Sequence, residues 1–331
     1  MQRQQQLERW LTSLFPGQPF SLTSASSDAS FRRYFRAKFD DGRTLIVMDA
    51  PPQHEDCRPF VKVAGMLHEI GLNAPQILAQ DLEQGFLLLS DLGTQTFLDV
   101  IDESNADGMF RDATDALIQW QLASKPDVLP AYDEALLRRE LNLFPEWYVG
   151  RHLGMELDDK QKQVLESAFA LLIKSNLAQP SVYVHRDFMP RNLMVSTPSP
   201  GILDFQDAVY GPISYDVVSL FKDAFISWEE ERVLDGAVRY WEKAKRAGLP
   251  VSQDFGEFYR DFEWMGMQRH FKVLGIFARI NYRDGKPKYL ADTPRFMEYV
   301  RKVAQRYNAF GLLLKLLDQL ENRQDETGYT F

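Results

Sequence analysis

The stretch Val184-His-Arg-Asp-Phe-Met-Pro-Arg-Asn-Leu-Met194 decides how the 331-residue chain is interpreted. It places Asp187 five residues before Asn192, and Asp204 follows twelve residues later in Gly201-Ile-Leu-Asp-Phe205. Short apolar runs surround these polar residues and predict three β-strands, at Val182–Val184, Leu193–Val195 and Ile202–Phe205. We therefore expect the three polar side chains at the ends of short strands or in the loops between them.

Asp187, Asn192 and Asp204 are the residue types that phosphoryl transfer from a nucleotide requires. A carboxylate must orient the attacking hydroxyl and accept its proton, and oxygen ligands must hold Mg²⁺ against the β- and γ-phosphates. Asp187 suits the first role, and Asn192 with Asp204 suits the second. A single aspartate in a loop is more often a turn former, but the ordered set is far more specific.

The segment resembles the catalytic and metal loops of the protein-kinase-like small-molecule kinases, the aminoglycoside phosphotransferase and choline kinase group. The resemblance covers most of the chain and implies a two-lobed α+β fold. Residues 1–92 would form an N-lobe with a small antiparallel sheet, and residues 93–331 a larger, mainly helical C-lobe. It also implies ATP and Mg²⁺, with Asp187 as catalytic base, Asn192 and Asp204 as metal ligands, and His185 packed under the loop.

Three charged residues near this motif are further candidates. Arg191 suits pairing with the catalytic carboxylate or binding of the transferred phosphoryl group, because a guanidinium binds either one bidentately. A plain surface arginine is the alternative. Asp207 is a candidate substrate ligand, with a turn residue as the alternative. Asp216 precedes an apolar helix, and we expect it to cap that helix or anchor the loop.

The N-terminal part predicts a helix over the first fifteen residues, a hairpin and a buried strand at Phe86–Ser90. Small residues precede the hairpin where the family has its phosphate-covering loop. Ser27 and Ser30 are therefore candidate nucleotide contacts through backbone N–H groups, with a simple polar turn as the alternative. The connector Leu88–Gly93 would offer backbone groups to adenine, with Leu92 near the ring.

The third strand departs from the family pattern. Kinases of this type place a Lys there to hold the α- and β-phosphates, whereas this chain has Met48. Arg33, on the adjacent strand, is our candidate for the missing charge. Strand alternation would direct Arg32 to the opposite face. The alternative is that both arginines are exposed strand charges.

From Thr94 onward, apolar periodicity predicts mostly helices, separated by the short strands around the motif. The expected helices cover residues 106–124, 133–151, 158–178, 214–225, 228–247, 254–280 and 294–321.

Composition excludes several classes of protein. The formal charge is −9, which argues against a general nucleic-acid binder. The single Cys57 excludes an intramolecular disulfide. No apolar run approaches the roughly 18 residues of a membrane span, and the start lacks a signal-peptide core. The length suggests about two domains, at roughly 150 residues each. We expect a cytoplasmic globular protein that binds no nucleic acid or membrane; no protein partner is indicated.

Several segments are similar to one branch, the anomeric amino-sugar kinases of cell-wall recycling, which also carry Met in place of the Lys. The similar segments are Ser27–Arg36, Val47–Pro52, Leu88–Phe97, Ile202–Ala208 and Gly211–Asp216. The resemblance implies phosphorylation of the C1 hydroxyl of N-acetylmuramate and N-acetylglucosamine. Two other functions stay open: a kinase of another alcohol (aminoglycoside, choline or homoserine-like), and a nucleotide-binding pseudokinase, which Met48 favours.

A basic segment between Met265 and Leu290 carries six Lys and Arg but one acid, Asp284. The lactyl carboxylate of N-acetylmuramate gives this charge a possible partner. Arg269 and Lys272 on the expected helix, or Arg283 after it, are the candidate contacts. A solvated helix face is the alternative.

Overall fold

The computed structural model describes residues 2–26 and 31–321. The predicted nucleotide contacts Ser27 and Ser30 lie outside these residues. The chain divides into two compact units. The first contains Met1–Ala116 and Arg191–Asp207, and the second contains Leu117–Pro190 and Ala208–Phe331.

The first unit contains the predicted antiparallel sheet, with strand order β1-β2-β3-β5-β4. The strands are β1 (Phe20–Ser26), β2 (Arg33–Phe39), β3 (Thr44–Asp49), β4 (Ile77–Asp81) and β5 (Phe86–Ser90). The β2–β3 hairpin turns at Asp40–Arg43, as the sequence predicts, with Arg33 opposite Asp49 and Tyr34 opposite Met48. The sequence of β5 is a continuous apolar run, because four of its five residues are buried.

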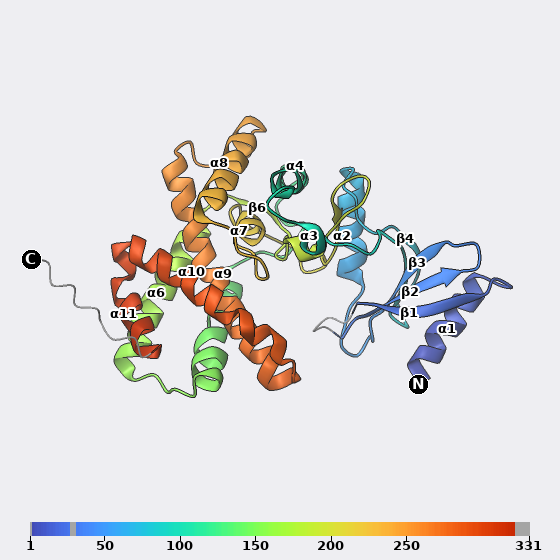
Figure 1. The fold of residues 1–331 in the computed structure, drawn as a ribbon, viewed down its shortest axis with the longest axis horizontal. Coiled ribbons are helices and arrows are strands. Elements are labelled where there is room, and N and C mark those ends of the chain that lie inside the picture. Colours follow the sequence, from blue (N-terminus) through green and yellow to red (C-terminus); the bar gives the residue numbers. More distant parts are fainter. Residues whose placement is uncertain (1, 27–30, 322–331) are drawn as a thin grey trace, which may run out of the picture. The chain divides into compact units, whose positions relative to one another are not determined.

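Two helices belong to this unit's core. α1 (Gln2–Leu14) lies beside the sheet (Figure 1). Its Leu7 and Leu11 share a hydrophobic cluster with the sheet residues Val47 and Phe86. α2 (Arg58–Glu69) buries Phe60, Val63, Ala64 and Leu67, which share one helix face. Both helices are therefore held by an apolar stripe.

A short hairpin, β7 (Leu193–Met194) with β8 (Gly201–Ile202), also belongs to the first unit. Backbone hydrogen bonds join Val195 N to Gln95 O (2.9 Å) and Ile202 N to Asn73 O (2.7 Å). A Cβ on Gly201 would lie 2.7 Å from Ser196 Oγ, so this close approach requires glycine. The hairpin is thereby tied to the N-terminal segment, together with α3 (Phe97–Val100). The lobe boundary at residue 92 stays a prediction.

The second unit is mainly helical, with one antiparallel strand pair, β6 (Ser181–Val184) and β9 (Val209–Pro212). Its helices are α5 (Glu134–Leu141), the π-helical segment η1 (Phe144–His152), α6 (Asp159–Ala178), α7 (Tyr215–Phe221), α8 (Glu230–Arg246), α9 (Phe255–Asp284), α10 (Thr293–Arg306) and α11 (Gly311–Leu320). The 3₁₀ turns η2 (Pro190–Asn192), η3 (Pro287–Asp292) and η4 (Asn308–Phe310), and α4 (Ala106–Leu122), complete the described elements.

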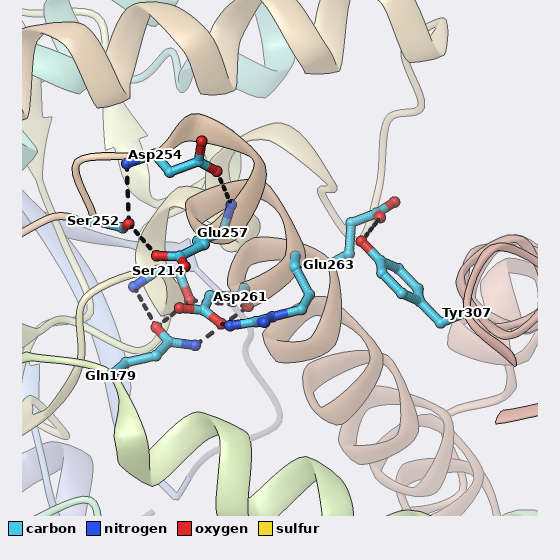
Figure 2. A network of polar contacts seen from close by, with 9 residues as sticks. Gln179, Ser214, Ser252, Asp254, Glu257, Asp261, Glu263 and Tyr307 are labelled. Atoms are coloured by element: carbon cyan, nitrogen blue, oxygen red, sulfur yellow. Dashed lines mark hydrogen bonds and ion pairs between the residues drawn. The ribbon is translucent and has the colours of Figure 1, made fainter. Parts of the chain in front are cut away.

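The long helix α9 is the centre of the second unit. A Cβ on Gly275 would lie 2.4 Å from the backbone of Leu143, so α9 and the residue before η1 pack backbone to backbone. At its start, Asp254 caps α9 by accepting a hydrogen bond from Glu257 N at 2.9 Å (Figure 2). In the same network, the Gln179 side chain joins Ser214 to the carbonyl of Asp261. The turn before α7 is thereby tied to α9.

Three expected elements differ from the structure. The helix predicted over 133–151 is two segments, α5 and η1, and the one over 294–321 breaks after Arg306. The strand predicted at Ile202–Phe205 ends at Ile202, and Asp204 has a left-handed backbone with φ 61°. Within residues 2–26 and 31–321, no helix combines the length and the hydropathy of a membrane span.

Candidate active site

The loop that carries Asp187 is anchored by one buried carboxylate. His185 N and Arg186 N donate hydrogen bonds to the two oxygens of Asp216, at 2.6 and 3.0 Å. Asp216 lies in the first turn of α7 and is fully buried. Burial raises the pKa of Asp216 to about 7, although the two N–H donors act against this shift. The expectation that Asp216 anchors the loop is confirmed.

Buried aromatic packing supports the same loop from below. His185 is 2% exposed, and its ring lies edge-on to Phe188 with 5.6 Å between centroids. Arg186 has φ 77°, a conformation that costs a non-glycine residue energy and that the Asp216 contacts help to hold. His185 therefore packs under the loop, as the resemblance implied. Asp187 itself is half-buried at this turn.

The two predicted metal ligands lie together in the first unit. Leu203 N donates to Asn192 O at 2.9 Å, so Asn192 faces the residue just before Asp204 across the β7–β8 hairpin. Gln206 Nε2 donates to Asp204 Oδ1 at 2.8 Å. Asp204 follows β8 and has a left-handed backbone conformation, so it does not continue the strand.

These two side chains fit Mg²⁺. One carboxylate and one amide supply the oxygen ligands that Mg²⁺ prefers, and Mg²⁺ commonly takes its remaining ligands from phosphate and water. No group of three or more His, Cys, Asp and Glu side chains in the described part of the chain is arranged as a metal cage. The donor set suits an ion shared with a nucleotide. Asp187 and the two ligands belong to different units, and each is positioned within its own.

The two arginines before and at the start of β2 lie in different environments. Arg33 pairs with the fully buried Asp49 directly across the hairpin, with its Nε 3.1 Å from Oδ2. Arg32 precedes the strand, so strand alternation does not set its direction. Its Nη2 lies 4.0 Å from Asp204 Oδ1 and its Nη1 lies 3.5 Å from Glu55 Oε2. Arg32, rather than Arg33, therefore lies near the predicted metal ligand Asp204, and a nucleotide contact of Arg33 stays a prediction.

The connector after β5 is fixed by a bidentate ion pair. Arg36 donates to Asp91 at 2.6 Å (Nε) and 3.1 Å (Nη2), and Arg36 also donates to Gly93 O at 2.7 Å. Burial would raise the pKa of Asp91, but Arg36 and the N–H of Gly93 lower it overall. Leu92 packs over Gly201, because a Cβ added to Gly201 would lie 3.0 Å from Cδ1 of Leu92. A role of Leu92 at adenine stays a prediction.

The remaining candidates near the motif also stay predictions. Arg191 is half-buried in the turn η2, and Asp207 is exposed two residues after Phe205.

The basic segment is not an exposed strip. Lys272 is buried, with Nζ 2.8 Å from Tyr215 Oη and 3.2 Å from Glu140 Oε1. The charge of Lys272 therefore neutralises a buried carboxylate, and its expected substrate contact stays a prediction. Arg283 pairs with the neighbouring Asp284 at 2.7 Å.

Arg269 differs from both. It is 2% exposed, its Nη2 lies 3.8 Å from Met189 Sδ, and its Nη1 donates to no protein atom in the described residues. A guanidinium nitrogen buried without an acceptor is costly, and an anionic or carbonyl ligand would satisfy it.

Sequence reasoning missed Glu140. Its carboxylate accepts hydrogen bonds from Arg186 (2.6 Å), Tyr132 and Gln268 (3.2 Å), in addition to the ion pair with Lys272. Burial raises the pKa of Glu140, but Lys272, Arg186 and Tyr132 outweigh it and lower the pKa to about 2. An acid on the buried side of α5 was the available signal, since such a residue needs cationic partners.

Comparison with known proteins places the chain in a family. Residues 21–252 match the model of the phosphotransferase enzyme family. N-acetylmuramate/N-acetylglucosamine kinase of Pseudomonas aeruginosa is 56% identical over 328 residues, covering 96% of this chain and 97% of that one. The enzyme of the same name from Neisseria meningitidis is 51% identical and covers 100% of both chains.

The fold is shared with more distant structures. An ADP-bound aminoglycoside phosphotransferase superposes with a TM-score of 0.59 at 13% identity, covering 90% of this chain and 98% of that one. This likeness supports the predicted two-lobed α+β fold.

Proposed function

Because the chain belongs to the phosphotransferase enzyme family, we propose that it transfers the γ-phosphoryl group of ATP to the C1 hydroxyl of N-acetylmuramate and N-acetylglucosamine. The observation that carries the choice of sugar is the identity of 51% and 56%, over nearly the whole chain, to two enzymes named for these sugars. The ADP-bound neighbour supports a nucleotide donor. A cytoplasmic place in peptidoglycan recycling belongs to the same proposal.

In this reaction, the oxygen of the C1 hydroxyl attacks the γ-phosphorus, the bond to the β,γ-bridging oxygen breaks, and ADP leaves. Asp187 orients the hydroxyl and accepts its proton. Asn192 and Asp204 would hold Mg²⁺, which would supply positive charge at the phosphates. Arg191, four residues after Asp187, is a candidate cation for the transferred group.

Arg269 is the proposed contact for the lactyl carboxylate of N-acetylmuramate. Its buried Nη1 has no acceptor within residues 2–26 and 31–321, and its Nη2 contacts Met189, two residues after Asp187. A carboxylate would satisfy this donor with a charge-assisted hydrogen bond. Asp207 is retained as a candidate ligand for a sugar hydroxyl.

A test compares ADP release by the purified chain with N-acetylmuramate, N-acetylglucosamine, an aminoglycoside, choline and homoserine as acceptors. We expect turnover with the two amino sugars and none above background with the other alcohols. Asp187→Asn should lose turnover and retain ADP binding. Turnover with an aminoglycoside alone would contradict the proposed substrate class, and nucleotide binding without turnover on any acceptor would favour a pseudokinase.

A further inference from the structure

Position 48 provides no charge for a nucleotide. Met48 is fully buried and lies opposite Tyr34 in β2 and Leu87 in β5. The two cations next to the end of β3 are both engaged by Asp49, whose carboxylate pairs with Arg3 at 2.7 Å and with Arg33. Asp49 is fully buried, so removing either cation leaves a carboxylate under-neutralised. Neither arginine can move to a phosphate without this cost.

Arg32 lies in a different environment. Its guanidinium reaches Glu55 and Asp204 at 3.5 and 4.0 Å, distances of charge attraction rather than of close bidentate hydrogen bonds. Its side chain is 13% exposed, and that of Asp204 is 39% exposed. Glu55 and Asp204 thus hold this cation beside the proposed metal site.

We propose that Arg32 supplies the positive charge toward the nucleotide phosphates that a strand-three Lys supplies in related enzymes, with Glu55 holding its guanidinium in place. The inference rests on the proposed function, because Asp204 is a metal ligand only if the chain uses a nucleotide. Mg²⁺ held by Asp204 would bridge phosphate oxygens, and a guanidinium 4.0 Å from that carboxylate lies within reach of the same oxygens. Its planar fork suits two phosphate oxygens at once.

The test measures binding by calorimetry without any sugar. Wild type, Arg32→Met and Arg32→Gln are titrated with adenosine and with ADP, with and without Mg²⁺. A lost charge-assisted contact should weaken ADP binding about tenfold or more and change adenosine binding less than about twofold. Arg43→Met is the matched control. Arg43 lies at the opposite end of the same hairpin and pairs with Asp41 at 3.7 Å, so this variant should bind both ligands as wild type does.

Two results would overturn the inference: unchanged ADP affinity in the folded Arg32 variants, or equal losses for ADP and adenosine. The sugar assay separates this inference from the proposed function. If the wild type binds ADP but phosphorylates no sugar, only the proposed function is contradicted. The comparison of ADP with adenosine binding then still decides the role of Arg32. Turnover on sugar by wild type, with normal ADP binding in Arg32→Met, contradicts the inference alone.

Discussion

The ammonium nitrogen of Lys272 lies 3.2 Å from Oε1 of Glu140, and both side chains are more than nine-tenths buried. Glu140 also pairs with Arg186, which immediately precedes Asp187. A residue of the long helix α9 is thereby connected to the loop of the proposed base through one shared carboxylate. This ion pair is therefore a structural support of the loop and not a surface charge open to substrate.

Replacing Lys272 should reduce stability and not sugar preference. Lys272→Met leaves Glu140 with one cation, and breaking a buried pair typically costs about 3–5 kcal/mol of unfolding free energy. Urea unfolding measures this loss, and Lys162→Met, an exposed lysine on α6, is the control. A fall in stability below about 1 kcal/mol, or a KM change confined to N-acetylmuramate, would restore Lys272 as a substrate contact.

The same pair predicts a pH dependence. The pKa of Glu140 is lowered from 4.5 to about 2, so its stabilising contribution is complete above pH 4.5 and is lost as the pH falls toward 2. Lys272 is one cause of this lowering. The difference in unfolding free energy between wild type and Lys272→Met should therefore be constant from pH 5 to 8 and shrink toward pH 3. A difference that stays constant to pH 3 would contradict the assigned pairing.

The contribution of Asp216 to stability should depend on pH in the opposite direction. Its pKa is raised from 3.8 to about 7 by burial, so the folded state favours its neutral form. Wild-type stability relative to Asp216→Asn should then be greatest below about pH 4 and fall as the pH rises to 7. Asn also replaces one acceptor oxygen with an NH₂ group that faces an N–H donor, which should disturb the loop. We therefore expect kcat to drop while the KM for ATP changes little. Unfolding at several pH values and steady-state kinetics test both parts; equal kcat would remove Asp216 from loop positioning.

Arg269 should discriminate between the two proposed sugars. Arg269→Met should raise KM for N-acetylmuramate about tenfold or more relative to N-acetylglucosamine, because only the first has a carboxylate for the guanidinium. Arg260→Met, on the same helix but exposed and paired with Asp261, is the control and should alter neither KM. Equal effects of Arg269→Met on both sugars would contradict the carboxylate contact.

The ion pair between Arg33 and Asp49 can be tested separately. Arg33→Met removes hydrogen bonds to the buried Asp49 and should lower unfolding free energy by about 1–3 kcal/mol. Arg3→Met should act in the same way, and the double variant should lose more than the sum because Asp49 then has neither cation. Chemical denaturation of the four proteins measures the coupling. Additive losses would mean that the two arginines do not share Asp49.

The sequence was informative where neighbours in the chain carry the signal. The β2–β3 hairpin and Asp216 as the anchor follow from local pattern, whereas His185 beneath the loop was implied by the family resemblance. Arg32, Lys272 and Glu140 did not, because their roles depend on residues far away in the chain. Alternation failed at Arg32 since the strand starts one residue later. A helical segment rich in Lys and Arg suggested a binding face, but Glu140 on α5 neutralises the charge of one of its residues, Lys272.

The central claim is phosphorylation at C1, and phosphorus NMR tests it most directly. The purified chain is incubated with ATP, Mg²⁺ and N-acetylmuramate labelled with ¹³C at C1, beside an Asp187→Asn control. We predict one new phosphomonoester signal that couples to the labelled carbon, formed by wild type and absent with Asp187→Asn. No new signal, or a phosphomonoester without coupling to C1, would contradict the proposed reaction.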